Sequence, residues 1–372
     1  MVEPTSLRGA GEPRADESAP TGVTAAATLP AACVVRPFMP QDRLPWNTYV
    51  QEHPEGTFFH LAEWAGVLER AFGHQSHYLL AERAGEVVGV LPLAEVRSLL
   101  FGHALVSTPF CVYGGVLAAD ESAVSALERA ACELGERLGV SYIEMRNRRP
   151  VHKNWLTKDL YVTFRRPLAA DAEGDLRASP RSRRRGVRKA QDKGLRAEVD
   201  ADTARLYSIY SESLRNLGTP VFTRRYPAIL QETFGNSCDV LTVVSGSTAV
   251  ASVMNFYFRD EVMPYYAGSI PVARELAAYD FLYWHVMERA RRRGARVFDF
   301  GRSRQGSGSF EFKVHWGFVP ETLAYQYLLV RATAMPNLSP SNSQYQRLIG
   351  VWRYLPLPVT RWIGPPLARY LG

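Results

Sequence analysis

The chain has 372 residues, of which 46% are hydrophobic and 11% aromatic, and it carries a net charge of +7. This composition excludes a disordered or fibrous protein, and the length suffices for a sizeable core, which we expect to divide between two domains. No apolar run of the sequence reaches the roughly 20 residues that a membrane-spanning helix needs. The basic excess favours anionic partners such as phosphates, RNA or acidic lipid head groups.

The first 32 residues are rich in Ala, Pro, Thr, Gly and Ser and lack the continuous apolar segment of a signal peptide. This composition predicts a disordered leader over 1–32. The four cysteines have no CxxC or Cys/His metal spacing; they are Cys33, Cys111, Cys132 and Cys238. We therefore expect reduced thiols, no metal site and a cytoplasmic protein.

The same order of predicted elements occurs in both halves of the chain. The first half reads as a helix, a strand pair, a further strand, a helix and a strand, over 58–72, 77–96, 101–117, 122–138 and 141–146. The second half reads as two helices, a strand pair, a strand, a helix and a strand, over 206–217, 226–234, 240–258, 261–267, 275–293 and 296–300. We expect an internal duplication in an α/β protein. The expected domains are 33–165 and 196–332, joined by a basic linker over 166–195 and followed by a tail over 333–372.

The stretch 294–319 carries the most chemistry. Its strand is apolar enough to be interior, and it delivers Asp299, Arg302 and Arg304 to the carboxyl end, where open α/β sheets bind ligands. Asp299 is a candidate proton acceptor if its carboxylate faces the cleft, and a structural ion pair with Arg302 or Arg304 is the alternative. The two arginines are candidate phosphate clamps, because guanidinium groups bind such anions bidentately.

A loop of glycines and serines leads from this strand into one or two helical turns. If Ser309 caps these turns, Phe312 and Trp316 fall four residues apart on one face, with Lys313 beside them. Lys313 could hold a donor phosphate or stabilise an oxyanion, and the alternative is a side chain that only extends over Phe312. His315 lies next to Trp316, which favours a packing role over that of a base.

Three further residues are candidates for the acceptor groove. Asn255, Tyr265 and Tyr266 lie on adjacent predicted strands, and the alternative for the tyrosines is a hydroxyl satisfied within the core. The first half has no counterpart of Lys313. We expect its region 113–115 to help bind the acceptor rather than react.

A basic segment over 177–196 separates the halves, with nine basic residues and one acidic residue. A solvated, charged helix or linker is one interpretation. The other is a phosphate-binding arm, with the contacts Arg183, Arg184, Arg185, Arg188 and Lys189. A plain RNA-binding protein is a further alternative that depends on this segment alone.

The last 40 residues change in character. Apolar side chains recur at helical spacing through Tyr345, Leu348, Ile349, Trp352 and Leu355, and a proline-rich aromatic end follows. This pattern predicts either an appended helix packed on the body or a helix in peripheral contact with the inner membrane surface.

The repeated unit, followed by an aromatic residue and a lysine after its last strand, resembles the Fem family of peptidyl transferases, which have two GNAT-type acyltransferase domains. Four stretches are similar to the Fem-like acyltransferases found beside exosortase and PEP-CTERM protein-sorting genes: DVLTVVSGSTAVASVMNFYFRDEVMPYYAGS, ELAAYDFLYWHVMERARRRG, FDFGRS and LPLPVTRWIGPPLARYLG. The similarity covers residues 35–332 and is more specific in the second half. It implies two tandem GNAT-like α/β domains, with one active cleft formed chiefly by the second.

The resemblance also implies an activity. The family's aromatic and lysine pair falls on Phe312 and Lys313, where the lysine supplies positive charge to the nucleic-acid donor or the reacting centre. The implied reaction transfers an acyl or aminoacyl group to an amine of a cell-envelope precursor, of peptidoglycan or exopolysaccharide. The segment 271–276 lacks the glycine-rich loop that holds a CoA pyrophosphate. We therefore expect no tightly bound cofactor, and aminoacyl-tRNA or an acyl thioester as donor, with acyl-CoA less favoured.

A function of another class is a non-catalytic tandem-GNAT protein that binds an anionic envelope precursor at the membrane surface of an exosortase-linked system, because a fold does not guarantee activity. The two hypotheses differ in one test. An enzyme requires a severe loss of function from Lys313→Ala, whereas a binding protein tolerates the change.

Overall fold

The computed structural model describes residues 32–98, 102–151, 155–334 and 350–370. The chain divides into two compact units, residues 1–32 and 33–372, and the second unit holds the described helices and strands. The predicted leader therefore lies, apart from Ala32, outside the described residues. The same is true of three members of the predicted tail helix, Tyr345, Leu348 and Ile349.

The first half of the second unit forms two sheets with three helices. Its elements are β1 (Val34–Pro37), α1 (Arg43–Glu52), α2 (Glu63–Phe72), β2 (Gln75–Ser76), β3 (Leu79–Arg83), β4 (Glu86–Leu91), β5 (Leu93–Ser98), β6 (Gly102–Ser107), β7 (Leu117–Ala118), α3 (Glu121–Leu138), β8 (Tyr142–Asn147) and β9 (Leu156–Lys158). One sheet has the order β1-β3-β4-β7, and the other runs β2-β5-β6-β8-β18-β9. Only β18 comes from the far end of the chain.

Helix α3 shows how local sequence sets these boundaries. The Asp120 side chain accepts a hydrogen bond of 3.0 Å from the Ala123 amide, which satisfies a free N–H of the first turn. Gly139 ends the helix at a φ of 70°, a left-handed conformation that glycine adopts without a steric penalty. Leu127 and Leu134 on the inner face are buried. The helix predicted at 122–138 is therefore confirmed.

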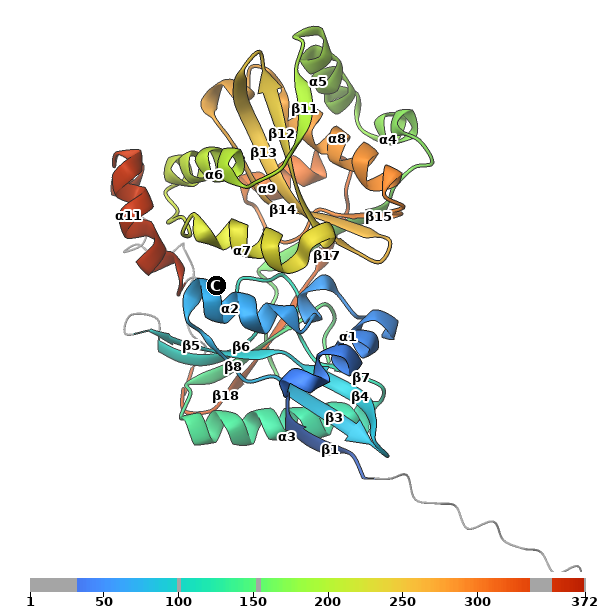
Figure 1. Cartoon of the computed structure of the whole chain (residues 1–372), viewed down its shortest axis with the longest axis vertical. Coiled ribbons are helices and arrows are strands. Elements are labelled where there is room, and N and C mark those ends of the chain that lie inside the picture. The colour runs from blue at the N-terminus through green and yellow to red at the C-terminus, as the bar shows by residue number, and fades with distance from the viewer. Residues whose placement is uncertain (1–31, 99–101, 152–154, 335–349, 371–372) are drawn as a thin grey trace, which may run out of the picture. The chain divides into compact units, whose positions relative to one another are not determined.

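The second half repeats the order of two helices, a strand hairpin, a third strand, a helix and a strand (Figure 1). Its elements are β10 (Tyr161–Pro167), α4 (Ala172–Ala178), α5 (Arg181–Asp192), β11 (Arg196–Asp200), α6 (Ala204–Leu217), α7 (Arg225–Phe234), β12 (Cys238–Ser245), β13 (Thr248–Phe258), β14 (Glu261–Ser269), α8 (Ala278–Arg292), β15 (Val297–Asp299), β16 (Ser303–Arg304), α9 (Gly308–Val314), β17 (Pro320–Thr322) and β18 (Ala324–Leu329). The hairpin turns at Gly246, whose φ is 60°, as the sequence predicts. The expected fold, a tandem α/β arrangement, is what the structure shows.

Each half receives a strand from the neighbouring part of the chain. β10 pairs with β15 and β16 in the sheet of the second half, which has the order β11-β12-β13-β14-β15-β10-β16. β18 pairs with β8 and β9 in the first half. The predicted boundary at residue 165 falls inside β10. The exchanged strands tie the two halves together.

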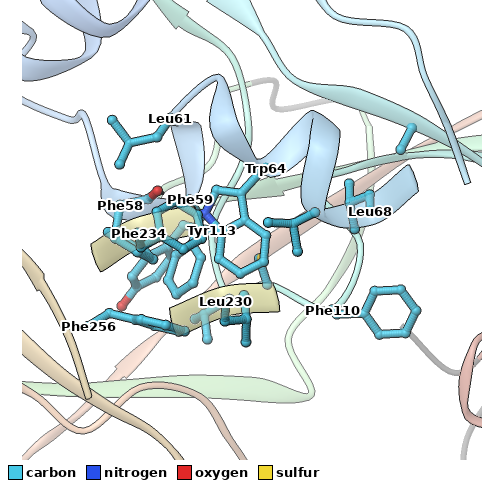
Figure 2. Packing of buried hydrophobic residues seen from close by; sticks show 14 of the residues in the cluster. Phe58, Phe59, Leu61, Trp64, Leu68, Phe110, Tyr113, Leu230, Phe234 and Phe256 are labelled. Atoms are coloured by element: carbon cyan, nitrogen blue, oxygen red, sulfur yellow. Dashed lines mark hydrogen bonds between the residues drawn. The ribbon is translucent and has the colours of Figure 1, made fainter. Parts of the chain in front are cut away.

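The largest core cluster also joins the halves. Figure 2 shows residues of α2 and the preceding turn packed with residues of α7 and β13. The Phe58 ring lies 4.5 Å from the rings of both Phe234 and Phe256. Such pairs contribute about 0.5–1.5 kcal/mol each beyond the area that they bury.

The proline-rich end of the chain forms the helix α11 (Leu357–Ala368), which packs on α6 (Figure 1). Its inner face is made of the small, buried residues Thr360, Gly364 and Ala368. A Cβ at Gly364 would lie 3.0 Å from the carbonyl oxygen of Val221, so glycine permits the close approach. Residues 350–352 of the tail helix predicted from the sequence are helical, and its members before them lie outside the described residues. Helix α11 is a further packed helix, over the proline-rich segment.

Candidate active site

Two neighbouring strands, β14 and β15, diverge at the centre of the sheet of the second half. β14 and β15 run parallel but pair only at Glu261 with Val297 and at Val262 with Phe298. β14 then continues to Ser269, whereas β15 ends at Asp299. In the described residues no other strand pairs with this edge of β14. The carboxyl ends of the two strands therefore open, in the place where α/β sheets bind ligands.

Helix α9 brings Lys313 to this opening. Ser307 caps the helix, because its hydroxyl accepts a hydrogen bond of 3.3 Å from the Phe310 amide. The prediction that Ser309 caps this helix is therefore wrong. Its hydroxyl contacts those of Ser303 and Ser307 instead, since the helix begins one residue before it, at Gly308.

Lys313 is only 8% exposed and points back at the strand end. Its ammonium group donates hydrogen bonds of 2.9 Å to the Gly301 carbonyl and 3.1 Å to the Arg302 carbonyl. It lies 5.5 Å from the Phe164 ring and 5.7 Å from the Phe300 ring. Burial lowers the pKa of Lys313 to about 7, although the charge of Asp299 works in the opposite direction. The side chain does not extend over Phe312, so that alternative is wrong.

Asp299 is fully buried and lies in a network that spans both halves. Its carboxylate accepts hydrogen bonds of 2.8 Å from Tyr113, 3.2 Å from Thr163 and 2.7 Å from the Gly301 amide. Its ion-pair partner is Arg165, at 3.3 Å, and not Arg302 or Arg304, the partners that the structural alternative named. Direct proton transfer requires a carboxylate that faces the cleft, and this condition is not met here. Asp299 instead orients the loop that begins at Gly301.

Glu261 joins this network and was not identified from the sequence. It forms a two-point ion pair with Arg165, at 3.1 and 2.6 Å. Burial, and then the neighbouring charge of Asp299, raise the pKa of Glu261 to about 7. A carboxyl group with such a pKa can exchange a proton near neutral pH. The only sequence signal is a glutamate at the start of a strand, which is too common to single it out.

Arg302 is held against two aromatic rings. Its guanidinium carbon lies 4.5 Å from the Tyr161 ring centroid and 5.6 Å from that of Tyr325. It also donates a hydrogen bond of 3.2 Å to the Tyr325 hydroxyl. Among the residues that the structure describes, no carboxylate pairs with Arg302, Arg304 or Lys313. The strand end therefore carries three cations without ionic partners.

The candidates for the acceptor groove are placed differently. Asn255 is fully buried, and its amide donates a hydrogen bond of 2.9 Å to Asp239, so it lines no open groove in this structure. The Tyr265 hydroxyl donates to the Phe110 carbonyl at 2.7 Å. The Tyr266 hydroxyl lies 2.7 Å from that of Tyr226. Both tyrosines satisfy their hydroxyls internally, which is the alternative raised from the sequence.

In the first half, the end of β8 corresponds to the end of β15, and side chains of the first half fill the space beside it. Arg146 is buried and donates hydrogen bonds of 2.8 Å to Glu144 and 2.7 Å to the Cys111 carbonyl. Gly115 packs so tightly against Asn147 that a Cβ would lie 2.8 Å from the amide carbon of that side chain. After β8, Arg148 pairs with Glu55 at 3.9 Å and Arg149 is exposed, so among the described residues this strand end holds no buried cation without a partner. Its contribution to the second half is Tyr113.

Helix α5 connects the basic segment to this site. Arg183 donates a hydrogen bond of 2.8 Å to Asp280, and its guanidinium carbon lies 5.7 Å from the Phe312 ring. Arg184 donates two hydrogen bonds of 3.0 Å to the carbonyls of residues 177 and 179. The exposed residues Arg185, Arg188 and Lys189 have no ion pair in the described part of the chain. The segment is thus a helix with a structural face and a free basic face.

Most backbone amides of the turn before α8 donate hydrogen bonds to carbonyls within the same turn. The amides of Ala273, Arg274, Leu276 and Ala277 donate to the carbonyls of residues 270, 271, 272 and 274, respectively. A CoA pyrophosphate binds to free amides at such a helix start. These four amides are therefore not available to a pyrophosphate.

The fold is similar to that of GNAT-like proteins. Residues 177–314 match the model of the Acetyltransferase (GNAT) domain family. The crystal structure of FemX is similar over 79% of this chain and 97% of its own, with a TM-score of 0.59 and 14% identity. A tandem GNAT protein from the clavulanic acid biosynthesis pathway is similar over 79% of this chain and 97% of its own, with a TM-score of 0.51 and 12% identity.

A third similar structure is that of L-PGS from Bacillus licheniformis, over 88% of this chain and 97% of its own, with a TM-score of 0.52 and 12% identity. At such identities the likeness shows the fold alone. A comparison with curated protein sequences found no match. Within the described residues, no helix has both the length and the apolar character needed to cross a membrane, and no cluster of three or more His, Cys, Asp or Glu could hold a metal ion.

Proposed function

We propose that this chain is an N-acyltransferase that transfers an acyl or aminoacyl group to an amine of a cell-envelope precursor. The observation that carries the proposal is the pair of cations Arg302 and Lys313 at the open end of β14 and β15, neither with a carboxylate partner among the described residues. Burying such charges is costly unless an anion compensates them. A developing oxyanion or a donor phosphate supplies that anion.

In the proposed reaction, the amine nitrogen attacks the carbonyl carbon of an ester or thioester donor. The new C–N bond forms, the carbonyl oxygen becomes an oxyanion, and the C–O or C–S bond to the donor then breaks. Arg302 stabilises the oxyanion. Lys313 holds two consecutive carbonyls of the loop and adds positive charge when an anion at the site keeps it protonated. The amine proton passes to Glu261 through water, and the leaving oxygen or sulfur takes up a proton.

The donor is aminoacyl-tRNA or an acyl thioester on a carrier. The turn at 271–277 supports this choice, since its bonded amides disfavour a CoA pyrophosphate. For a tRNA donor, the exposed basic face of α5 offers the phosphate contacts Arg185, Arg188 and Lys189. Arg183 and Arg184 serve the structure of this helix instead.

The acceptor class depends on the Fem-like sequence features and on the structural likeness to FemX. A peptidoglycan precursor and an exopolysaccharide precursor both present amines, and the exosortase-linked features favour the second. In either case the protein acts at the cytoplasmic side, where such precursors are assembled.

The test uses the purified full chain, envelope precursors extracted from cells, and either tRNA charged with labelled amino acids or labelled acetyl-CoA. We expect label to reach the precursor from tRNA. Lys313→Met is expected to lower the rate at least about 100-fold, as the loss of an oxyanion-stabilising group does. Arg129→Met, which removes an exposed charge of α3, is the control and is expected to react at the wild-type rate.

Each other outcome has a definite meaning. Transfer from acetyl-CoA alone would overturn the donor assignment and leave the reaction class intact. Absence of transfer from both donors, with a folded protein, would contradict the proposal.

A further inference from the structure

Helix α11 exposes its large apolar residues and buries its small ones. The buried face carries Thr360, Gly364 and Ala368, whereas Val359 and Trp362 face outward. A surface helix of a globular protein normally has a polar outer face. Here Arg361 is the only charged residue among the twelve of the helix. The outer face of α11 is therefore apolar with nothing in the chain described to cover it.

The orientation of this face is fixed by contacts at both ends of the helix. Arg361 donates a hydrogen bond of 2.9 Å to Ser211 on α6. The Arg369 carbonyl lies 2.7 Å from the His74 ring nitrogen, which comes from the first half. A rotation of α11 that buried Trp362 would break these contacts and drive Gly364 away from Val221. The apolar face is thus held outward by the rest of the molecule.

Two aromatic residues of this region, Tyr354 and Trp362, are the most exposed large hydrophobic side chains of the described residues. Tyr354 is 90% exposed and Trp362 is 81% exposed, and Val351 and Val359 add to the same region. Tryptophan and tyrosine favour the boundary between water and lipid, because they combine an apolar ring with a polar atom.

The positive charge of residues 322–372 indicates an anionic partner for this face. Residues 322–372 contain five arginines and neither aspartate nor glutamate. Arg353 is exposed next to Tyr354. Two copies of such a surface would repel each other, whereas anionic head groups would attract it. An apolar face beside an exposed arginine, in a segment without acidic residues, suits a helix that binds the surface of an anionic bilayer.

From these observations we propose that Tyr354, Val359 and Trp362, together with Arg353, form a docking surface for an anionic lipid bilayer. The rings enter the head-group region, and the guanidinium group contacts lipid phosphates. This inference does not depend on the acyltransferase activity. It accounts for an apolar helix face that the fold itself leaves open.

The test is co-sedimentation of the full chain with two kinds of vesicle, phosphatidylcholine alone and an equal mixture of phosphatidylcholine and phosphatidylglycerol. We expect binding to the mixed vesicles and little to the neutral ones. Replacing both rings, Tyr354→Ser with Trp362→Ser, is expected to weaken binding at least about tenfold, because each ring buries a large apolar area. Arg353→Gln is expected to weaken it about fivefold.

A matched control replaces exposed apolar residues elsewhere. Val34 is 60% exposed and Leu44 is 77% exposed, and Val34→Ala with Leu44→Ala is expected to bind vesicles like wild type. The test variant replaces two rings that are exposed in the wild-type chain, so its melting temperature is expected to stay at the wild-type value. Equal binding of the ring variant and wild type would overturn the proposal. So would a dimer, seen by light scattering, that the ring variant converts to a monomer, since the face would then bind a second copy.

Discussion

Tyr113 of the first half donates a hydrogen bond of 2.8 Å to Asp299 of the second half, across 186 residues of sequence. The same hydroxyl lies 2.7 Å from that of Thr163 on the exchanged strand β10. The order at the end of β15 thus depends on three separate parts of the chain. The first half thus contributes to the order of this strand end even though its own strand end is filled.

The first prediction concerns this hydroxyl. Tyr113→Phe leaves the buried Asp299 carboxylate with one donor fewer, which is expected to lower the free energy of unfolding by about 1–3 kcal/mol. Tyr78→Phe is the matched control. Tyr78 is equally buried, but its hydroxyl has no hydrogen-bond partner in the described structure. Urea denaturation of both variants measures the difference, and an equal loss in the two would refute the role given to the Tyr113 hydroxyl.

The second prediction concerns the protonation of Lys313. Its pKa is about 7 in the folded protein, against an ordinary value of 10.5. Between these values the unfolded chain binds a proton that the folded chain does not, so the stability of the folded state increases with pH. Relative to Lys313→Met, the free energy of unfolding of wild type is expected to rise by up to about 1.4 kcal/mol per pH unit in this window. Denaturation curves that shift in parallel for both proteins would rule out the lowered pKa.

The third prediction tests the contact between α5 and α8. In Gly186→Ala, the new Cβ would lie 2.9 Å from the Asp280 Cγ atom, and Asp280 is held in place by Arg183. We expect a loss of about 1–3 kcal/mol in the free energy of unfolding from this overpacking. Gly66→Ala, in α2, is the control, because its Cβ would meet nothing within 4 Å. That change is expected to stabilise the protein by about 1 kcal/mol through helix propensity. Thermal or urea unfolding distinguishes the two, and a stable Gly186→Ala would show that α5 packs differently.

The fourth prediction separates the two faces of α5. Replacing Arg185, Arg188 and Lys189 with glutamine is expected to weaken RNA binding and to reduce the slope of log affinity against log salt by about 2 to 3. Arg183→Gln is expected to destabilise the fold through Asp280 instead. Fluorescence anisotropy with a labelled tRNA at several salt concentrations measures the slope. An unchanged slope in the triple variant would exclude this face as the contact.

The order of elements was predictable because it depends on local signals. Helix periodicity, a capping residue such as Asp120 and a turn glycine such as Gly246 act within a few residues of sequence. The cap of α9 was missed because Ser307 and Ser309 have the same chemistry, and only the folded loop selects between them. The exchange of β10 and β18 was missed because strand partners distant in sequence leave no local pattern.

Less of the site was predictable. Lys313 and Arg302 were identified from their place after a buried strand and from a family resemblance. Tyr325 contacts Arg302, and Arg165 and Glu261 join the network of Asp299. They come from three other strands, and nothing local marks them as neighbours of the site. Asn255 was misplaced because strand alternation does not tell which face of a strand meets a core and which meets a cleft.

The measurement that tests the central claim most directly is mass spectrometry of envelope precursors and polysaccharide from three strains. The strains carry the wild-type chain, Lys313→Ala, or no gene. We expect a mass increment on an amine-bearing precursor with the wild-type chain alone, and its mass identifies the transferred group. Identical profiles in all three strains, with the variant shown to be folded, would contradict acyl transfer and favour a binding protein.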